Sequence, residues 1–399
     1  MQVESYVPRA GIQFETGGLA NIVAGLGVVS PRTGEPFTEG ALIGLGGGIG
    51  GGYMLFEMCG EKYVVTGFRR DWQKYKGEFS ETVCARLGVG VEICESGGVK
   101  KAEADLRAAL DAGRPAWVTA AEAALPHRGL PVSLAKGLVY GLVVFGHDGD
   151  TFYAHDVCAA PVELSAETLR FARSVITSNK NRLLLFSAPA APLTPAALAE
   201  ATLEAIRQCA HEMLNPPIKN FGVTAWQKWG GMAANLKDKK GWPTVLAEER
   251  HLRDGMRTLY ESVIQESGDT GGLRGLYAAF LDDAASQLDR PALARVAEQY
   301  RDLEQRWRDL FAAILPESHP VLSRIRAGIE ERHRLLRSGD PNALPELQRL
   351  RSQQESLVAE GEPTPPEARQ ELFEGIAGRL KAIYSAELEA AQSLQAAAS

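Results

Sequence analysis

The segment 44–52 restricts most strongly how this chain can fold, because seven of its nine residues are glycine. Each glycine in a helix costs about 1 kcal/mol relative to alanine. Gly46, Gly48 and Gly51 also satisfy the spacing GxGxxG of dinucleotide-binding loops. Such a loop needs a strand before it, and residues 36–42 do not have a convincing strand pattern. We therefore interpret the segment as a place where backbones pass closely together.

The overall composition is that of a globular protein, with 45% hydrophobic residues, 23% charged residues and a net charge of −7. This mildly acidic balance argues against nucleic acid as a main partner. No run of about 18 apolar residues and no signal-peptide pattern is present, so we expect no membrane association. Five scattered cysteines without CxxC spacing indicate reduced thiols in a cytoplasmic protein, with no metal site.

The first half of the chain alternates short helix and strand patterns. The patterns are a helix at 15–28, β-rich runs at 62–68, 116–119 and 181–186, and a hairpin of 138–145 and 151–157 around a turn at 147–150. Ser165 is placed to cap a further helix.

The second half is predicted to be helical. A stretch rich in proline and alanine at 187–195 separates the halves, and Thr194 followed by proline predicts a helix start. Apolar residues recur every three or four positions at 252–263 and 293–314. The four residues from Thr364 have the form of a capping box before a last helix.

Several motifs occur in a characteristic order: GIQFETGGLANIVAGLGV, EGALIGLGGGIGGGYMLF, ALDAGRPAWV, LPHRGLP and LVYGLVVFGHDGDTFYAHDV. In this order they resemble the butirosin biosynthesis protein H family. The second half, through ESGDTGGLRGLYAAFL, resembles the helical domain of unknown function that often follows in that family. The resemblance implies an α+β fold: a papain-like domain with the cysteine-protease fold over residues 1–190, and an all-α domain over 191–399.

The resemblance also implies where an active site would lie. In a papain-like site, a cysteine at the start of the first helix is activated by a histidine on a distant strand, which a carboxylate or amide orients. The family's first member uses this site to move an aminoacyl group from a carrier protein to an amine. Here the family's His-Cys pair falls on Gln13 and Phe14, and the strand histidine falls on Tyr140 or Gly141. Only the orienting acid, Asp156, is present, which argues against a covalent route.

The remaining polar groups of the predicted cleft can act without covalent chemistry. The catalytic candidates, which can position a proton or an amine, are Glu15, Tyr140 and Asp156. The candidates for substrate binding are Gln13, Phe14, Thr16, His147 and Arg274. The alternative for Glu15 is a purely structural carboxylate at the start of a helix.

Arg274 lies at the start of a predicted helix, after a glycine turn. It can bind an anionic group such as a phosphopantetheine arm or a carboxylate. Its alternative is an ion pair with Asp269, Asp282 or Asp283.

Other residues that can carry chemistry have simpler structural explanations. Cys59 and Cys84 are more typical of inert core thiols than of replacement nucleophiles. His147 and His155 lie either side of the hairpin and can face a common pocket, but no metal-binding spacing accompanies them. His155 and Asp156 are adjacent on a strand and therefore point to opposite faces.

Trp226 and Trp229, at a step of three, fit a helical core better than a ligand-binding wall.

Two hypotheses of different class follow. In the first, the protein is an enzyme of specialised metabolism, related to acyltransferases, that positions a small-molecule or carrier-protein-bound acyl, peptidyl or amine substrate for acid/base chemistry. In the second, it is an inactive homologue that binds a carrier protein, a small molecule or an active partner. We favour the first, because the glycine segment predicts a ligand pocket. We expect no cofactor, and a homodimer formed through the amphipathic C-terminal helices.

Overall fold

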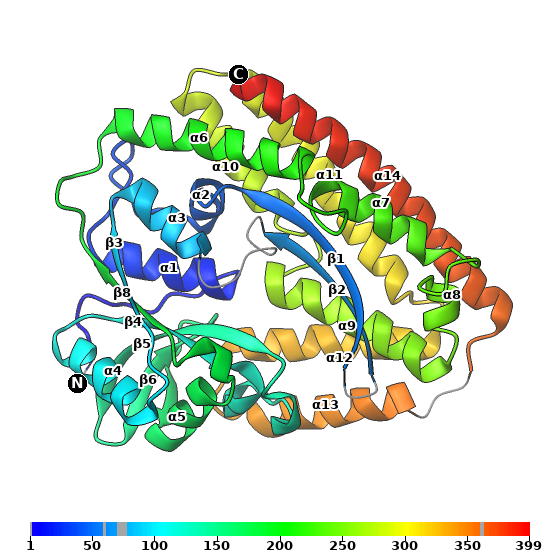
Figure 1. Ribbon diagram of the computed structural model, residues 1–399, viewed down its shortest axis with the longest axis horizontal. Helices are drawn as coiled ribbons and strands as arrows, with labels where there is room; N and C mark the ends of the chain where they lie inside the picture. The colour runs from blue at the N-terminus through cyan, green and yellow to red at the C-terminus, as the bar shows by residue number, and fades with distance from the viewer. Residues whose placement is uncertain (1, 59–60, 70–77, 360–362) are drawn as a thin grey trace. The chain divides into compact units, whose positions relative to one another are not determined.

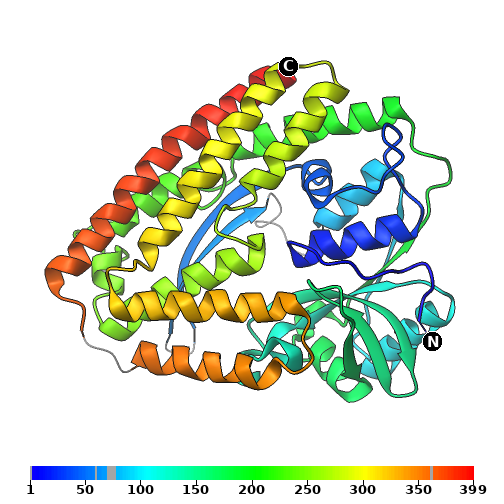
Figure 2. The same cartoon turned by 180° about the vertical axis from the view of Figure 1, so that it is seen from behind.

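The computed structural model describes residues 2–58, 61–69, 78–359 and 363–399 (Figure 1, Figure 2). The chain forms two compact units, and neither is a continuous stretch of sequence. Unit 1 consists of Met1–Glu39, Val83–Leu198 and Glu331–Ser352, and unit 2 consists of Gly40–Thr82, Ala199–Glu330 and Gln353–Ser399. The compact units therefore alternate along the chain instead of dividing it once near residue 190.

Unit 1 contains a six-stranded antiparallel sheet with the strand order β3-β8-β4-β5-β6-β7. Its strands are β3 Gly90–Cys94, β4 Ala116–Ala121, β5 Val139–Asp148, β6 Thr151–His155, β7 Val162–Ser165 and β8 Leu183–Ser187. Its helices are α1 Phe14–Gly25, α4 Val99–Asp111 and α5 Ala166–Ser174, while α3 Glu78–Leu87 spans a boundary between the units.

The predicted hairpin and helix cap of this unit are confirmed. Strands β5 and β6 pair around Gly149, whose φ of +54° suits a glycine in a tight turn. The backbone N–H of Thr168 donates to the Ser165 hydroxyl at 3.1 Å, which caps α5 as expected. Strand β5 is buried from its second to its eighth residue, because α1 and α4 both pack against it.

The described residues of unit 2 form helices and one hairpin. Its helices are α2 Glu39–Leu45, α6 Pro195–Leu214, α7 Gly222–Ala233, α8 Trp242–Val245, α9 Glu249–Ser267, α10 Arg274–Gln287, α11 Ala292–Ile314 and α14 Pro366–Ala398, of which α2 and α6 begin in unit 1. Two further helices, α12 Pro320–Ser338 and α13 Leu344–Ala359, are divided between the units. Figure 2 shows α11 and α14 running side by side. No helix in the described ranges is both long and apolar enough to span a membrane.

The hairpin of unit 2 is formed by β1 Ile49–Met58 and β2 Glu61–Arg69, which come from the first half of the sequence. It packs among helices: the N–H of Val64 donates to the Thr258 hydroxyl at 3.1 Å, and the N–H of Phe68 donates to the Glu266 carboxylate at 2.9 Å. The regular elements of residues 191–359 and 363–399 are helices, as predicted. The hairpin from the first half of the sequence buries side chains in the core of unit 2.

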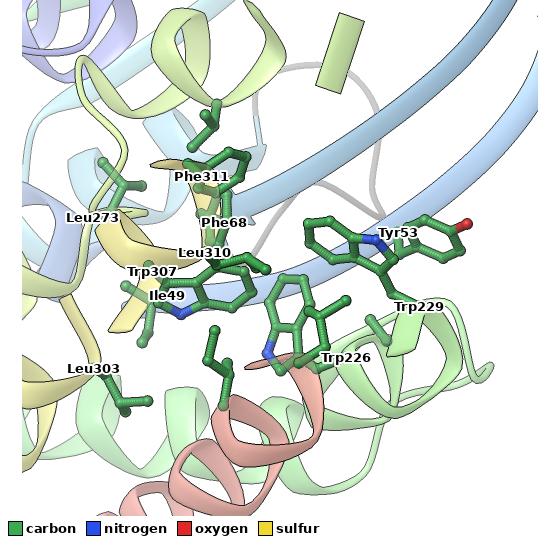
Figure 3. Close-up of a cluster of buried hydrophobic side chains, with 14 of the residues drawn as sticks. Ile49, Tyr53, Phe68, Trp226, Trp229, Leu273, Leu303, Trp307, Leu310 and Phe311 are labelled. Atoms are coloured by element: carbon green, nitrogen blue, oxygen red, sulfur yellow. The ribbon is translucent and has the colours of Figure 1, made fainter. Parts of the chain in front are cut away.

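An aromatic cluster lies at the centre of unit 2 (Figure 3). The rings of Trp226 and Trp307 are 4.6 Å apart, and Phe68 from β2 lies 5.5 Å from Trp226. Tyr53 from β1 stacks on Trp229 at 5.5 Å. Trp226 and Trp229 have no exposed surface, which confirms their prediction as core residues.

The glycine segment connects α2 to β1, so a helix precedes it and a strand follows it, the reverse of a dinucleotide-binding loop. A Cβ atom on Gly44 would lie 2.2 Å from the Phe280 ring, and one on Gly51 would lie 2.5 Å from the carbonyl oxygen of Gly222. Close backbone packing is confirmed. The expectation of a ligand pocket at this segment is wrong, because side chains of unit 2 fill the space beside the glycines.

The start of α14 also differs from the prediction. Pro365 is the cap residue, and the Thr364 hydroxyl instead donates to the Glu249 carboxylate at 2.7 Å and lies 2.9 Å from Nε2 of His319. The predicted capping box is thus replaced by a tertiary contact with the start of α9. The Thr194 cap of α6 is confirmed, since Ala197 donates its N–H to the hydroxyl at 3.2 Å.

Candidate functional site

The first turn of α1 is held by two side chains. Gln13 is the cap residue, and its Oε1 accepts the N–H groups of Glu15 at 2.9 Å and Thr16 at 2.8 Å. The Glu39 carboxylate accepts the N–H groups of Ile12 at 2.7 Å and Gln13 at 3.1 Å. It also accepts the Thr16 hydroxyl at 2.6 Å. Thr16, which we predicted to bind substrate, is fully buried and its hydroxyl is already used in this way.

Phe14, the first residue of α1, faces two aromatic side chains of the sheet. Its ring lies 4.5 Å from that of Tyr140 on β5 and 6.3 Å from that of Trp117 on β4. Trp117 fits here because Gly18 and Gly141 lack side chains: added Cβ atoms would lie 2.7 and 2.1 Å from its ring. Of the two positions considered for the family's histidine, Tyr140 therefore faces Phe14 and Gly141 faces Trp117.

Asp156 accepts hydrogen bonds from four donors. Its Oδ1 accepts the Tyr140 hydroxyl at 2.5 Å and the backbone N–H of Val157 at 2.8 Å. Its Oδ2 accepts Nε2 of His127 at 2.9 Å and Nη1 of Arg128 at 3.4 Å. The positions of the predicted nucleophile, base and acid thus meet in one contact network, now occupied by Phe14, Tyr140 and Asp156.

Charges in this network are fixed by burial and pairing. Burial alone would raise the pKa of Asp156, but Arg128 and the hydrogen bonds from His127 and Tyr140 hold it well below its usual range. Arg128 also donates to the Glu122 carboxylate at 2.7 Å and lies 4.7 Å from the centre of the Tyr140 ring. Burial, the largest effect, raises the pKa of Tyr140 well above its usual value. At neutral pH Asp156 is ionised and Tyr140 is a neutral donor.

His127 is a site residue that the sequence analysis missed, although it lies in the quoted motif LPHRGLP. Its side chain is 21% exposed, and its Nδ1 is enclosed without a hydrogen-bond partner in the part of the chain that the structure describes. In the sequence, the indication of a site residue here is weak: a histidine two positions before a glycine that adopts a positive φ. Here Gly129 has a φ of +61° and ends the short 3₁₀ helix Pro126–Arg128.

The segment Glu331–Ser352 supports both sides of this site within unit 1. Arg337 donates to the carbonyl oxygen of Ile12 at 3.1 Å, directly before the cap of α1. Arg332 donates to the carbonyl oxygen of Arg128 at 3.2 Å, in the loop that carries His127. Residues distant in sequence therefore position the two ends of the network.

The two other histidines considered as candidates lie elsewhere. Nε2 of His147, near the opposite end of β5 from Tyr140, lies 2.9 Å from the Asp111 carboxylate. His155 is buried, with Nδ1 2.5 Å from the Tyr6 hydroxyl and Nε2 3.0 Å from the carbonyl oxygen of Arg9. The two do not share a pocket, and the structure does not support the substrate-binding role predicted for His147.

Arg274 is also not placed to bind a ligand. It is fully buried in unit 2, where its Nε donates to the Glu387 carboxylate at 2.9 Å and its Nη atoms donate to the carbonyl oxygens of Gly272 and Gly50. The same carboxylate accepts the indole N–H of Trp307 at 2.8 Å. Its ion-pair partner is thus Glu387, and none of the three aspartates considered. A buried charge without this partner would be strongly destabilising.

The described cysteines do not have the lowered pKa of an activated thiol where a shift in pKa is resolved. Burial, followed by the charge of Asp156, raises the pKa of Cys158, whereas a nucleophilic cysteine needs a lowered pKa. Cys84 is fully buried, burial raises the pKa of Cys209 to about 11, and Cys59 lies outside the described residues. Within the described ranges, no three His, Cys, Asp or Glu side chains gather as metal ligands.

An antiparallel sheet with a helix starting against its long central strand, joined to a largely helical region, defines a protein with a papain-like α+β domain. Two family models match the chain: butirosin biosynthesis protein H, N-terminal, at residues 13–157, and a domain of unknown function, DUF4872, at residues 166–331. The order of these two matches is that of the butirosin biosynthesis protein H-like architecture. The first match begins at Gln13 and ends directly after Asp156. No curated protein matches the chain.

Proposed function

We propose that this protein acts in natural-product biosynthesis of the butirosin type. It would promote a reaction of an acyl, peptidyl or amine substrate at the start of α1 without forming a thioester between the substrate and a cysteine of the enzyme. The observation that carries the proposal is the contact between Phe14, Tyr140 and Asp156. A phenyl ring cannot attack a carbonyl group, and a neutral phenol of raised pKa does not accept a proton near neutral pH.

His127 is the proposed proton carrier of this site. Histidine is the side chain that most often exchanges protons near neutral pH, and Asp156 orients His127 through Nε2. As an amine attacks the acyl carbon, His127 takes the proton that the amine loses and returns it to the leaving group. Tyr140 and Asp156 are positioning residues, and the buried Glu15 carboxylate in the first turn of α1 holds the substrate amine.

A second candidate function has its own support. Asp156 accepts four hydrogen bonds, one of them from the Tyr140 hydroxyl. Such a network holds these side chains in fixed positions, as a rigid binding surface also requires. In this alternative the protein is an inactive homologue that binds a carrier protein, a small molecule or an active partner at the same residues.

The test follows amide formation from S-acyl N-acetylcysteamine thioesters and primary amines by mass spectrometry. We expect His127→Asn to lower the rate by about a hundredfold, the order of a lost general base. His147→Asn is the matched control, since it removes a histidine that is also paired with a carboxylate but at the other end of β5. Equal rates in both variants would remove His127 from the mechanism.

Two further outcomes separate the alternatives. Acylation of any cysteine, seen as an intact-mass increase after thioester exposure, would contradict the non-covalent route. Saturable binding of the thioester without turnover, unaffected by His127→Asn, would favour the binding homologue.

A further inference from the structure

Arg173, near the end of α5, is a buried cation without a carboxylate partner among the described residues. Its side chain is 4% exposed, and its Nη atoms donate to the carbonyl oxygens of Ala102 at 3.1 Å and Asn181 at 2.8 Å. Its Nε forms no hydrogen bond with any described residue. Burial lowers the pKa of Arg173 to about 10, so the guanidinium is still charged at neutral pH. A buried charge without a counter-charge is costly and needs an explanation.

This arginine borders a small cavity between α4 and α5 in unit 1. The cavity has a volume of about 10 Å³, which is room for one water molecule or one ion of similar size. Ala102 and Asn181, which accept the other donors of the guanidinium, line the same cavity. None of the lining residues belongs to the network around Asp156.

The charges around this cavity favour an anion. Glu103 also lines it, but Arg107 and Arg170 each donate to the Glu103 carboxylate at 2.9 Å. The next nearest carboxylate, that of Asp105, accepts a hydrogen bond from Lys101 at 2.6 Å. Both neighbouring carboxylates are therefore paired with other cations, and the buried guanidinium is the positive charge in excess.

The start of α4 adds to this positive potential. Val99, its first residue, lines the cavity, and the first turn contains no acidic side chain. The cap residue Gly98 offers no side-chain acceptor, so the positive end of the helix dipole is not offset by a side chain of this turn. Phe152 and other apolar side chains form most of the remaining wall. The small volume excludes polyatomic anions such as phosphate and sulfate.

We propose that this cavity binds a single halide ion, with the Arg173 guanidinium as its counter-charge. The ion supplies the negative charge that the described residues do not, and it links α4 to α5. Chloride is the natural candidate. The site is separate from the proposed function and does not depend on it.

The first test is urea unfolding of the full chain in sodium chloride and in sodium gluconate at the same ionic strength. We expect chloride to lower the unfolding equilibrium constant saturably, by about tenfold at ten times its dissociation constant. Bromide should replace chloride, whereas gluconate is too large for the cavity. Equal effects of chloride and gluconate overturn the inference.

Variants locate the effect. Arg173→Met removes the charge and should abolish the difference between chloride and gluconate. If that variant does not fold, Arg170→Gln removes a cation whose side chain is 43% exposed at the edge of the cavity, and several-fold more chloride should then be needed. The matched control is Arg114→Gln, which breaks the ion pair with Glu92 elsewhere in unit 1 and should leave the chloride effect unchanged. An unchanged chloride effect in folded Arg173→Met, or in Arg170→Gln, overturns the inference.

A direct measurement uses the parent protein alone. Crystals grown in sodium bromide should give an anomalous peak in this cavity, next to Arg173. Bromide peaks confined to the molecular surface would represent an adventitious ion only, and the inference would fail.

Discussion

At the scale of single residues, the side chain at position 14 limits the chemistry that the start of α1 can support. A helix N-terminus favours a thiolate, but residue 14 is a phenylalanine, and Asp156 accepts the Tyr140 hydroxyl. With Phe14 and Tyr140 in place, the same elements instead form an aromatic contact over a buried, fully hydrogen-bonded carboxylate. His127, the proton carrier of the proposed function, reaches Asp156 from a different loop.

Restoring a thiol alone is not expected to restore a nucleophile. In Phe14→Cys, Glu39 bonds the same turn and Tyr140 provides no basic nitrogen, so we expect a thiol pKa near or above about 8.5. In Phe14→Cys with Tyr140→His, an imidazole next to Asp156 should lower that pKa by about one unit or more. The pH dependence of alkylation by iodoacetamide, read by peptide mass, measures both. Equal reactivity of the single and double variants would contradict the expectation.

Asp156 also predicts how stability depends on pH. Because the pKa of Asp156 in the folded protein lies below that in the unfolded chain, its contribution is fully present above about pH 4 and is lost as the pH falls through its lowered pKa. We expect Asp156→Asn to cost about 2 kcal/mol or more at pH 7, with a difference from the parent that shrinks below about pH 4. Urea unfolding from pH 3 to pH 8 measures this. A difference in unfolding free energy between parent and variant that grows as the pH falls would contradict this prediction.

At the scale of elements, glycine decides how closely backbones approach. The turn between α2 and β1 and the start of β1 pack against α7 and α10 with no room for a methyl group. The absence of side chains at Gly18 and Gly141 likewise leaves room for the Trp117 ring between α1 and β5. The glycine-rich motifs of this chain therefore shape packing in both units.

A matched pair of glycine variants tests this. A Cβ atom in Gly51→Ala would lie 2.5 Å from the carbonyl oxygen of Gly222, so we expect a loss of about 2 kcal/mol of unfolding free energy. Gly231 on α7 has no atom within 4 Å of an added Cβ, so Gly231→Ala should be neutral or stabilise the helix by up to about 1 kcal/mol. Chemical denaturation measures both, and equal effects would disprove the packing argument.

At the scale of the whole molecule, each unit is completed by sequence from the other half of the chain. Unit 2 takes the β1–β2 hairpin from the first half, and unit 1 takes Glu331–Ser352 from near the end. The segment Glu331–Ser352 contributes to the candidate site, because its Arg332 and Arg337 donate to the loop of His127 and to the residue before the cap of α1.

This exchange predicts how fragments behave. Residues 191–399 alone lack Tyr53 and Phe68, which cover Trp229 and Trp226, so we expect red-shifted tryptophan emission and no cooperative unfolding. The control is the same fragment with residues 40–82 fused ahead of it, which should recover a blue-shifted spectrum. A cooperative transition in the shorter fragment would show that the hairpin is dispensable.

Much of the local structure could be predicted because its causes are local. Spacing and turn chemistry within a few residues determine the apolar face of α11, the helix caps at Ser165 and Thr194, and the β5–β6 hairpin. Thr364 was misjudged because a carboxylate on α9, Glu249, competes for its hydroxyl. Arg274 was misjudged because its partner is more than a hundred residues away in sequence.

For the site itself, the amino-acid sequence determined that positions 14 and 140 carry no thiol and no imidazole, since residue identity is independent of folding. It also determined the two family-model matches, in the order in which they occur along the chain. Only the tertiary structure decided that His127 shares Asp156 with Tyr140, and that His147 and Arg274 lie in other contacts. The physical reason is that these properties depend on burial and on partners from distant segments, which spacing along the chain does not encode.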